Sequence, residues 1–173
     1  PGCSSQTRSA PIWDPEKEVY KLWVMGVAPA PPHITVQGDF SGYYESKDGL
    51  NWHLPVVGEV EYGGSRENNF VTARVSGSYA RTDCVVYDKT DPDPQRRFKA
   101  SIPDCWHGCD WHTECTGGFA VSPDGIRWTE SSSPGIASYD EWGLSFDERE
   151  GLFIHYVKFS DPRFGYRSVY LST

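Results

Sequence analysis

Two stretches of this sequence share the pattern S-x-D-G-x-x-W: SKDGLNW at residues 46–52 and SPDGIRW at residues 122–128. The aspartate of such a stretch can accept hydrogen bonds from backbone N–H groups of its own turn. The glycine tolerates the positive φ that a tight turn requires, and the tryptophan is expected to anchor the turn in a core. The pattern therefore predicts turns between antiparallel strands, with structural roles for Asp48 and Asp124 and core positions for Trp52 and Trp128.

A second feature precedes each of these turns and occurs three times. An aromatic residue and an aspartate open a short polar turn, followed by an apolar run, at Trp13-Asp14, Tyr87-Asp88 and Phe146-Asp147. Each reads as a β-hairpin whose turn begins at the aspartate, so these aspartates are expected to be structural. The offset to the next serine is 32 residues from Asp14 to Ser46, 34 from Asp88 to Ser122 and 25 from Asp147 to Ser172. Two ordered features at similar offsets predict a repeat of roughly four strands, the size of a propeller blade.

Composition agrees with short strands joined by tight turns. The 173 residues include 17 Gly, 13 Pro, 7 Trp, 10 Tyr and 8 Phe but a single Met, and helical spacing of apolar residues is nearly absent. The net charge of −8 argues against nucleic acid and anionic membranes as partners. No apolar run approaches the length needed to span a bilayer. The aromatic and cysteine content favours an extracytoplasmic or secreted protein.

These motifs resemble two groups of known propellers. S-x-D-G-x-x-W resembles the Asp-box of sialidase-type propellers. The wider sequence resembles bacterial proteins similar to the five-bladed glycoside hydrolases, the superfamily of families 32, 43, 62 and 68. The matching stretches are residues 14–23, 44–52, 60–70, 91–99 and 120–128. The resemblance implies an all-β fold of propeller blades, each with four antiparallel strands.

The predicted domain organisation is a single partial propeller over residues 1–173. Blade 1 is expected at about 8–62, blade 2 at about 68–130 and an incomplete blade 3 at about 138–173, giving two and a half to three blades of an incomplete ring. An open ring leaves sheet edges exposed. We therefore expect the remaining blades to come from a longer chain or from another subunit.

Candidate catalytic residues come from the resemblance, which implies carboxylates at the start of the innermost strand of each blade. Hydrolysis of a glycosidic bond needs two carboxyl groups whose environments separate their pKa values. The candidates are Asp83 in blade 2 and Asp140 or Glu141 in blade 3. The alternative for Asp83 and Asp140 is a structural role in a turn or loop. The matching place in blade 1 holds Arg8, which we expect to bind a carboxylate or hydroxyl groups of the ligand.

The segment CWHGCDWHTEC at residues 105–115 concentrates thiol, imidazole and carboxyl groups. Such ligands suit zinc, but their spacing matches no common zinc module. We expect free thiols or a disulfide, joining Cys105 or Cys109 to Cys115, rather than a metal site, and no cofactor is predicted. Glu114-Cys115 matches the Glu-Cys pair of the invertase-like acid, which makes Glu114 a further candidate for the acid.

The sequence thus predicts a carbohydrate-active protein that hydrolyses glycosidic bonds of an oligo- or polysaccharide. Trp106, Trp111 and Trp142 are candidates for stacking on sugar rings, with core packing as the alternative. A non-catalytic propeller that binds a glycan or a protein is the competing hypothesis, favoured by the missing acid in blade 1. A third hypothesis is a metal-dependent protein that uses the Cys/His segment.

Overall fold

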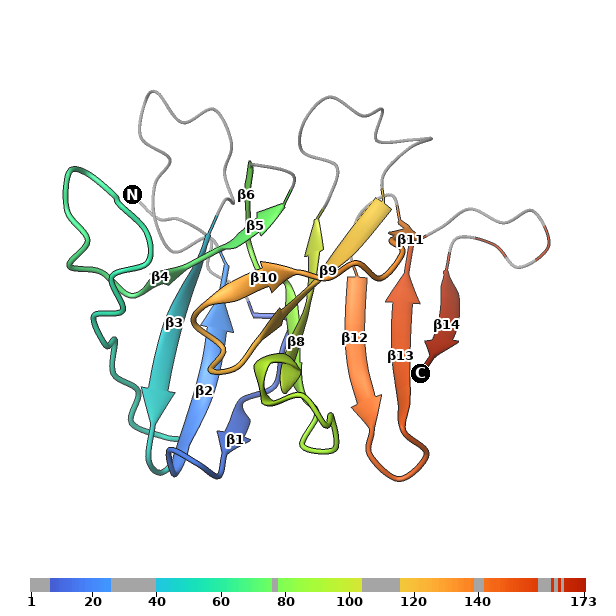
Figure 1. Ribbon diagram of the computed structural model, residues 1–173, viewed down its shortest axis with the longest axis horizontal. Coiled ribbons are helices and arrows are strands. Elements are labelled where there is room, and N and C mark those ends of the chain that lie inside the picture. Colours follow the sequence, from blue (N-terminus) through green and yellow to red (C-terminus); the bar gives the residue numbers. More distant parts are fainter. Residues whose placement is uncertain are drawn as a thin grey trace.

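The chain folds into three β-sheets that lie side by side in the computed structural model (Figure 1). The structure describes residues 7–25, 40–75, 78–103, 116–138, 142–158, 163, 165 and 167–173. These residues are all β, as the sequence predicts, apart from one short 3-10 turn, η1 (Pro94–Arg96). None of them belongs to a helix with the length and apolar character needed to cross a membrane.

The first sheet is an antiparallel meander of four strands in chain order. Its strands are β1 (Ile12–Asp14), β2 (Val19–Val24), β3 (Ser41–Ser46) and β4 (Phe70–Val71). The chain does not continue straight from β3 into β4: only His53 bridges back to Glu45, and the following residues form a loop before Phe70 pairs with Gly42. The first sheet therefore extends to Val71, beyond the boundary predicted near residue 62.

The second sheet repeats this order and then adds three short strands. Its meander consists of β7 (Cys84–Tyr87), β8 (Phe98–Pro103), β9 (Thr116–Ser122) and β10 (Trp128–Glu130). The edge strand β10 pairs in parallel with β5 (Ala73–Val75), and β5 pairs with β6 (Ser78–Ala80). A further strand, β11 (Ile136–Ala137), pairs with β9. The β5–β10 pair is the one parallel pairing among the described strands.

The third sheet has three described strands in the same meander order. They are β12 (Trp142–Asp147), β13 (Leu152–Val157) and β14 (Ser168–Ser172). Its inner strand β12 lies against β7 of the second sheet, so the three sheets follow one another in chain order.

Each of the three predicted hairpins is confirmed, with its turn at the predicted aspartate. In every case Oδ1 of the aspartate accepts hydrogen bonds from the backbone N–H groups two and three residues ahead, at 2.9–3.2 Å. These contacts close the turn from within and explain the position of Asp14, Asp88 and Asp147. Their predicted structural role is confirmed.

The two S-x-D-G-x-x-W turns have the same internal hydrogen bonds. In the 46–52 turn, Oδ1 of Asp48 accepts from the N–H groups of Leu50 and Asn51, both at 2.8 Å. In the 122–128 turn, Oδ1 of Asp124 accepts from the two equivalent N–H groups, both at 2.9 Å. The glycines have φ of 73° and 74°, which a residue with a Cβ adopts only with strain. The predicted turn chemistry is confirmed in both copies.

The main hydrophobic core lies between the first and second sheets. Trp23 of β2 is at its centre, with ring centroids 5.8 Å from Tyr43, 6.1 Å from Phe98 and 6.3 Å from Trp128. Trp128 is buried, as predicted, whereas Trp52 is only half-buried and lies outside this core. The predicted core position of Trp52 is therefore wrong, because none of the described sheets packs against the 46–52 turn.

Candidate functional site

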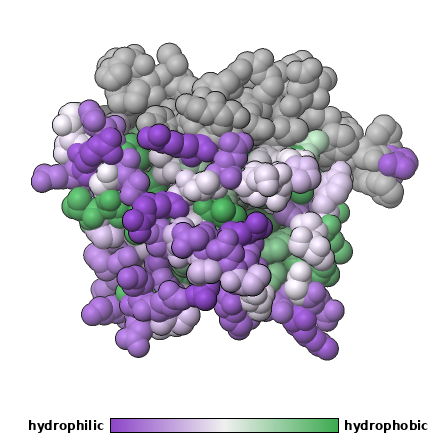
Figure 2. Space-filling model, in the orientation of Figure 1, coloured by the Kyte–Doolittle hydropathy of each residue, from purple (hydrophilic) through white to green (hydrophobic). Residues whose placement is uncertain are grey.

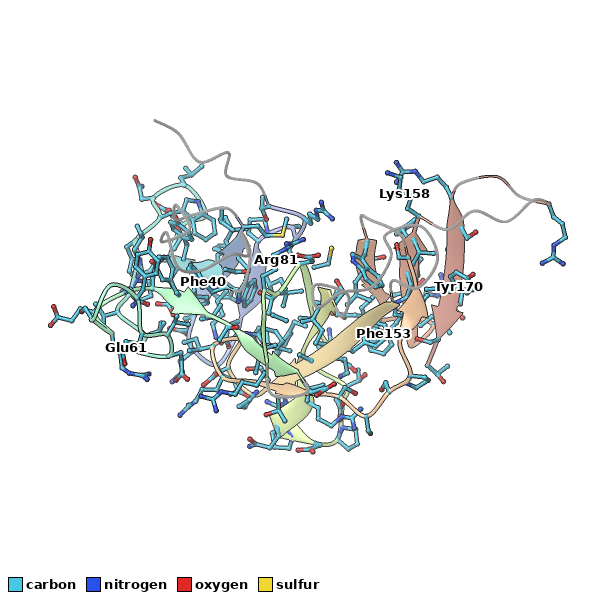
Figure 3. All side chains as sticks on the ribbon, turned by 90° about the horizontal axis from the view of Figure 1, so that it is seen from above. Phe40, Glu61, Arg81, Phe153, Lys158 and Tyr170 are labelled. Carbon is cyan, nitrogen blue, oxygen red and sulfur yellow. The ribbon has the colours of Figure 1, made fainter. Side chains whose placement is uncertain are left out.

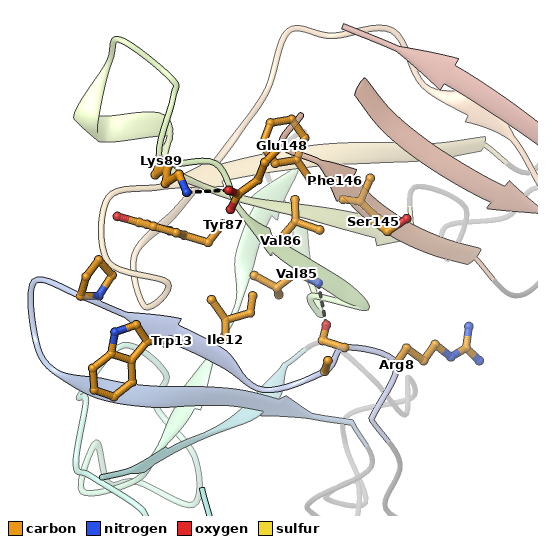
Figure 4. A pocket seen from close by; sticks show the side chains of 14 residues that line it. Arg8, Ile12, Trp13, Val85, Val86, Tyr87, Lys89, Ser145, Phe146 and Glu148 are labelled. Carbon is orange, nitrogen blue, oxygen red and sulfur yellow. Dashed lines mark hydrogen bonds and ion pairs between the residues drawn. The ribbon is translucent and has the colours of Figure 1, made fainter. Parts of the chain in front are cut away.

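The inner strands of the three sheets border one cavity of about 690 Å³ (Figure 4). Its lining comes from the segment that leads through β1, from β7 and from β12 with the turn that follows. Most of this lining is apolar, including Ile12, Val85 and Phe146. The cavity therefore borders the first strand of each of the three meanders.

A buried thiol joins the starts of β7 and β12 to the segment that precedes β1. Cys84 is the first residue of β7, and its Sγ lies 3.3 Å from the carbonyl oxygen of Trp142 and 3.6 Å from that of Arg8. Next to it, the backbone N–H of Val85 donates to Oγ of Ser9 at 2.6 Å. Burial raises the pKa of the Cys84 thiol, so it serves as a neutral donor. No local sequence pattern predicts that Cys84 joins these segments, because its partners Arg8 and Trp142 lie far from it in the chain.

Asp83 lies one residue before β7 but does not point into the cavity lining that the structure describes. Its side chain is fully buried, and Oδ1 accepts from Nε of Arg81 at 2.5 Å. Oδ2 lies 3.4 Å from Nη2 of the same guanidinium, and Figure 3 shows Arg81 near the middle of the molecule. The guanidinium of Arg81 thus contacts both oxygens of Asp83 and compensates the negative charge of the buried carboxylate. This contact favours the structural alternative for Asp83, while its catalytic role stays a prediction.

The remaining charges of the cavity lie at its opposite end. Glu148 is the single carboxylate among the described lining residues, and its Oε2 lies 2.6 Å from Nζ of Lys89. The hydrogen bond and charge of Glu148 raise the pKa of Lys89. This ion pair joins the hairpin turn of the second sheet to that of the third. Sequence reasoning missed it, although both residues directly follow a hairpin aspartate, at equivalent positions of the repeat.

Trp142, a predicted stacking residue, is buried at the start of β12. Its ring lies so close to Gly117 of β9 that an added Cβ on that glycine would come within 1.4 Å of a ring atom. Only a glycine fits beneath the indole, so Trp142 packs between the second and third sheets. The described packing leaves little of the ring accessible to a sugar. Arg8, in contrast, lines the cavity, and its role in binding a ligand stays a prediction.

The other predicted site residues lie outside the described residues. These are Asp140, Glu141, Glu114, Trp106 and Trp111, together with the cysteines of the 105–115 segment. Asp140 and Glu141 directly precede β12 in the sequence. Within the part of the chain that the structure describes, no group of three or more His, Cys, Asp or Glu residues could hold a metal ion.

The chain matches no protein-family model and no curated protein.

Proposed function

We propose that this chain is a segment of a β-propeller from a carbohydrate-active protein that resembles the glycoside hydrolases. The three meander sheets are its blades, and the cavity between β1, β7 and β12 is the inner part of its ligand site. One observation carries the proposal: the Cys84 thiol joins the start of β7 to the start of β12 and to the segment that precedes β1, the region in which the resemblance implies ligand-binding and catalytic residues. Arg8 lies in the segment before β1, Asp83 lies directly before β7, and Asp140 and Glu141 precede β12 in the sequence.

The proposed reaction is hydrolysis of a glycosidic bond by two carboxyl groups. One carboxyl group donates its proton to the leaving glycosidic oxygen, and the other, as a carboxylate, attacks the anomeric carbon or removes a proton from the attacking water. Asp140 or Glu141 is proposed for one of these roles and is preferred to Asp83, because the Asp83 carboxylate is already paired with the guanidinium of Arg81. Arg8 is proposed to bind hydroxyl or carboxylate groups of the sugar.

The test is sugar release from a panel of plant and microbial polysaccharides and aryl glycosides. The protein is compared with Asp140→Asn, Glu141→Gln and the control Asp93→Asn, which changes an exposed carboxylate in a turn. We expect release by the parent and the control, and a loss of at least about 100-fold in one of the two site variants. Release that persists unchanged in both site variants contradicts the assignment of these residues.

A second candidate function is non-catalytic binding of a glycan. Two observations favour it: Glu148, the single carboxylate among the described lining residues, is paired with Lys89, and Asp83 is paired with Arg81. A carboxylate bound to a cation at this distance is a poor acid or base for hydrolysis. Binding of an oligosaccharide that is weakened by Arg8→Ala, without product from any substrate, would support this function over hydrolysis.

A further inference from the structure

The third sheet presents an apolar face that is not covered by either of the other two described sheets. Tyr156 of β13 is 52% exposed, and Val169 and Leu171 of β14 are 57% and 62% exposed. The register places Tyr156 opposite Val169 and Ile154 opposite Leu171, so the side chains of these four residues share one face. Figure 1 shows β13 and β14 at the end of the row of sheets, and Figure 2 shows apolar surface at this end.

The equivalent face of the first sheet is fully buried. Val19 in β2 and Leu152 in β13 each pair with the hairpin aspartate of their sheet. Trp23 and Tyr156 each lie four residues after these positions, so they are equivalent in the repeat. Trp23 faces Tyr43 across the pair, as Tyr156 faces Val169. Trp23 and Tyr43 are 1% and 0% exposed. The same two positions of the repeat are therefore covered in one sheet and open in another.

The cover of the first sheet comes from two parts of the second sheet. The first part is the 122–128 turn: the carbonyl oxygen of Gly125 accepts from Nε1 of Trp23 at 2.8 Å, and that of Asp124 accepts from Nζ of Lys21 at 2.7 Å. The second part is the ring of Phe98, whose centroid lies 4.7 Å from the same ammonium group. A sheet of this repeat is thus covered by the turn and the second-strand aromatic residue of the next sheet.

The first sheet has the same two features, a turn and an aromatic residue on its second strand, but none of the described sheets packs against them. Its 46–52 turn corresponds to the 122–128 turn, and Tyr20 corresponds to Phe98. A Cβ added to Gly125 would meet the ring of Trp23 at 2.5 Å, whereas one added to Gly49 would meet only Tyr20 of its own sheet, at 3.8 Å. The place that Trp23 fills at Gly125 is open at Gly49. Trp13, which packs on Tyr20, is 42% exposed on this side.

We infer that the third sheet of one copy of this chain packs against the first sheet of a second copy, with Tyr156 on the 46–52 turn. The contact reproduces the interface between the first and second sheets, with Tyr156 at the position of Trp23 and Ile154 at that of Lys21. The open face of the third sheet is apolar, and the first sheet offers the exposed side chains of Leu50 and Trp13 beside its turn, so burial of these side chains drives association. The contact is head to tail, because the third sheet of one copy binds the first sheet of the other. Such contacts either close into a ring of six sheets from two copies or continue as a fibre.

The first test is the mass of the 173-residue chain in solution, measured by light scattering and sedimentation at concentrations up to about 100 μM, where a Kd near 1 μM leaves most chains associated. We expect a species of at least twice 19.5 kDa. The double variant Val169→Lys, Leu171→Lys should be monomeric. Tyr170→Lys, a matched change on the opposite face of β14, should keep the parent mass. A parent that is monomeric at every concentration contradicts the inference.

The second test maps the contact and does not depend on the stability of a variant. A photo-crosslinking phenylalanine analogue replaces Tyr156, and the sample is mixed with chain labelled with ¹⁵N. We expect crosslinks between copies to peptides that contain residues 46–52, and none from the same analogue at position 170. Crosslinks that form only within one copy, or that map to another region, overturn the proposal.

Discussion

The 46–52 and 122–128 turns share their internal hydrogen bonds but differ in what lies against them. In both, serine and aspartate oxygens bind the same backbone N–H groups at 2.8–2.9 Å. Carbonyl oxygens of the 122–128 turn also accept hydrogen bonds from Nε1 of Trp23 and Nζ of Lys21 in the first sheet. In the 46–52 turn, by contrast, the side chain of Leu50 is 83% exposed. The comparison teaches that local sequence makes the turn, and the neighbouring sheet decides whether the turn belongs to a core.

Removing the indole that covers the second turn has the largest expected effect. Trp23→Ala empties a fully buried site between two sheets and removes the hydrogen bond to Gly125, so we expect a loss of about 4 kcal/mol in the free energy of unfolding. The control is Tyr156→Ala at the equivalent, exposed position, with an expected loss below about 1 kcal/mol in the monomer. Urea unfolding measures both values. Similar losses for the two variants would contradict the claim that Trp23 is covered by the second sheet while Tyr156 is open.

Lys21→Met breaks the second contact to the same turn. The variant removes the donor to Asp124 and leaves the carboxylate of Asp14, whose Oδ2 lies 2.5 Å from Nζ, buried without a cation. We expect a loss of about 3 kcal/mol, because an uncompensated buried charge is strongly destabilising. Lys99→Met is the matched change in the second sheet. A greater loss for Lys99→Met than for Lys21→Met would count against this account.

Adding one methyl group at Gly49 or at Gly125 tests the difference between the two turns. Both have positive φ, so alanine at either position introduces strain of about 1 kcal/mol. At Gly125 the new methyl group also overlaps the ring of Trp23, which adds about 1–2 kcal/mol, whereas at Gly49 it meets only ordinary contacts. Chemical denaturation of Gly125→Ala and Gly49→Ala should therefore rank the first as less stable. Equal losses would show that the second turn is not packed as described.

The smallest expected effect is on the acid sensitivity of the two turns. Hydrogen bonds from Asn51 and Leu50 hold the pKa of Asp48 well below its usual range. For Asp124, burial raises the pKa, but the N–H groups of Arg127 and Ile126 and the Arg127 guanidinium outweigh it and lower the pKa overall. Because the folded pKa is the lower one, both carboxylates stabilise the fold above about pH 4 and lose this contribution as the pH falls.

The measurement is the pH dependence of the free energy of unfolding. The double variant Asp48→Asn, Asp124→Asn keeps one oxygen at each site as acceptor for the turn N–H groups, but it cannot titrate. We expect it to lose less stability than the parent between about pH 5 and pH 2. A parallel decline of parent and variant over this range would assign the acid sensitivity to other carboxylates.

Much of the fold follows from local sequence signals. Asp14, Asp88 and Asp147 mark the three hairpins, and the two S-x-D-G-x-x-W turns form as predicted, because their hydrogen bonds join residues two or three apart. The half-burial of Trp52 and the parallel pairing of β5 with β10 depend on which sheet lies alongside, and no local pattern contains that information. The displaced position of β4 follows from the loop after His53.

The candidate site was predictable only in outline. The candidate residues Arg8 and Asp83 do lie next to the contacts that join β7, β12 and the segment before β1, and Arg8 lines the cavity. The arginine fork on Asp83, the contacts of Cys84 and the Lys89–Glu148 pair depend on tertiary packing or on a choice among side-chain partners. These contacts determine which carboxylates remain available for chemistry, and they could be identified only from the structure.

Hydrogen exchange at the turn amides tests most directly the claim that equal turns differ only through their neighbours. The amides of Leu50 and Asn51 should exchange through local opening, and those of Ile126 and Arg127 only through opening of the core between the first two sheets. We expect slower exchange in the second turn in dilute protein, and Trp23→Ala should bring it to the rate of the first. Equal rates in the parent, or a second turn unaffected by Trp23→Ala, would contradict the account.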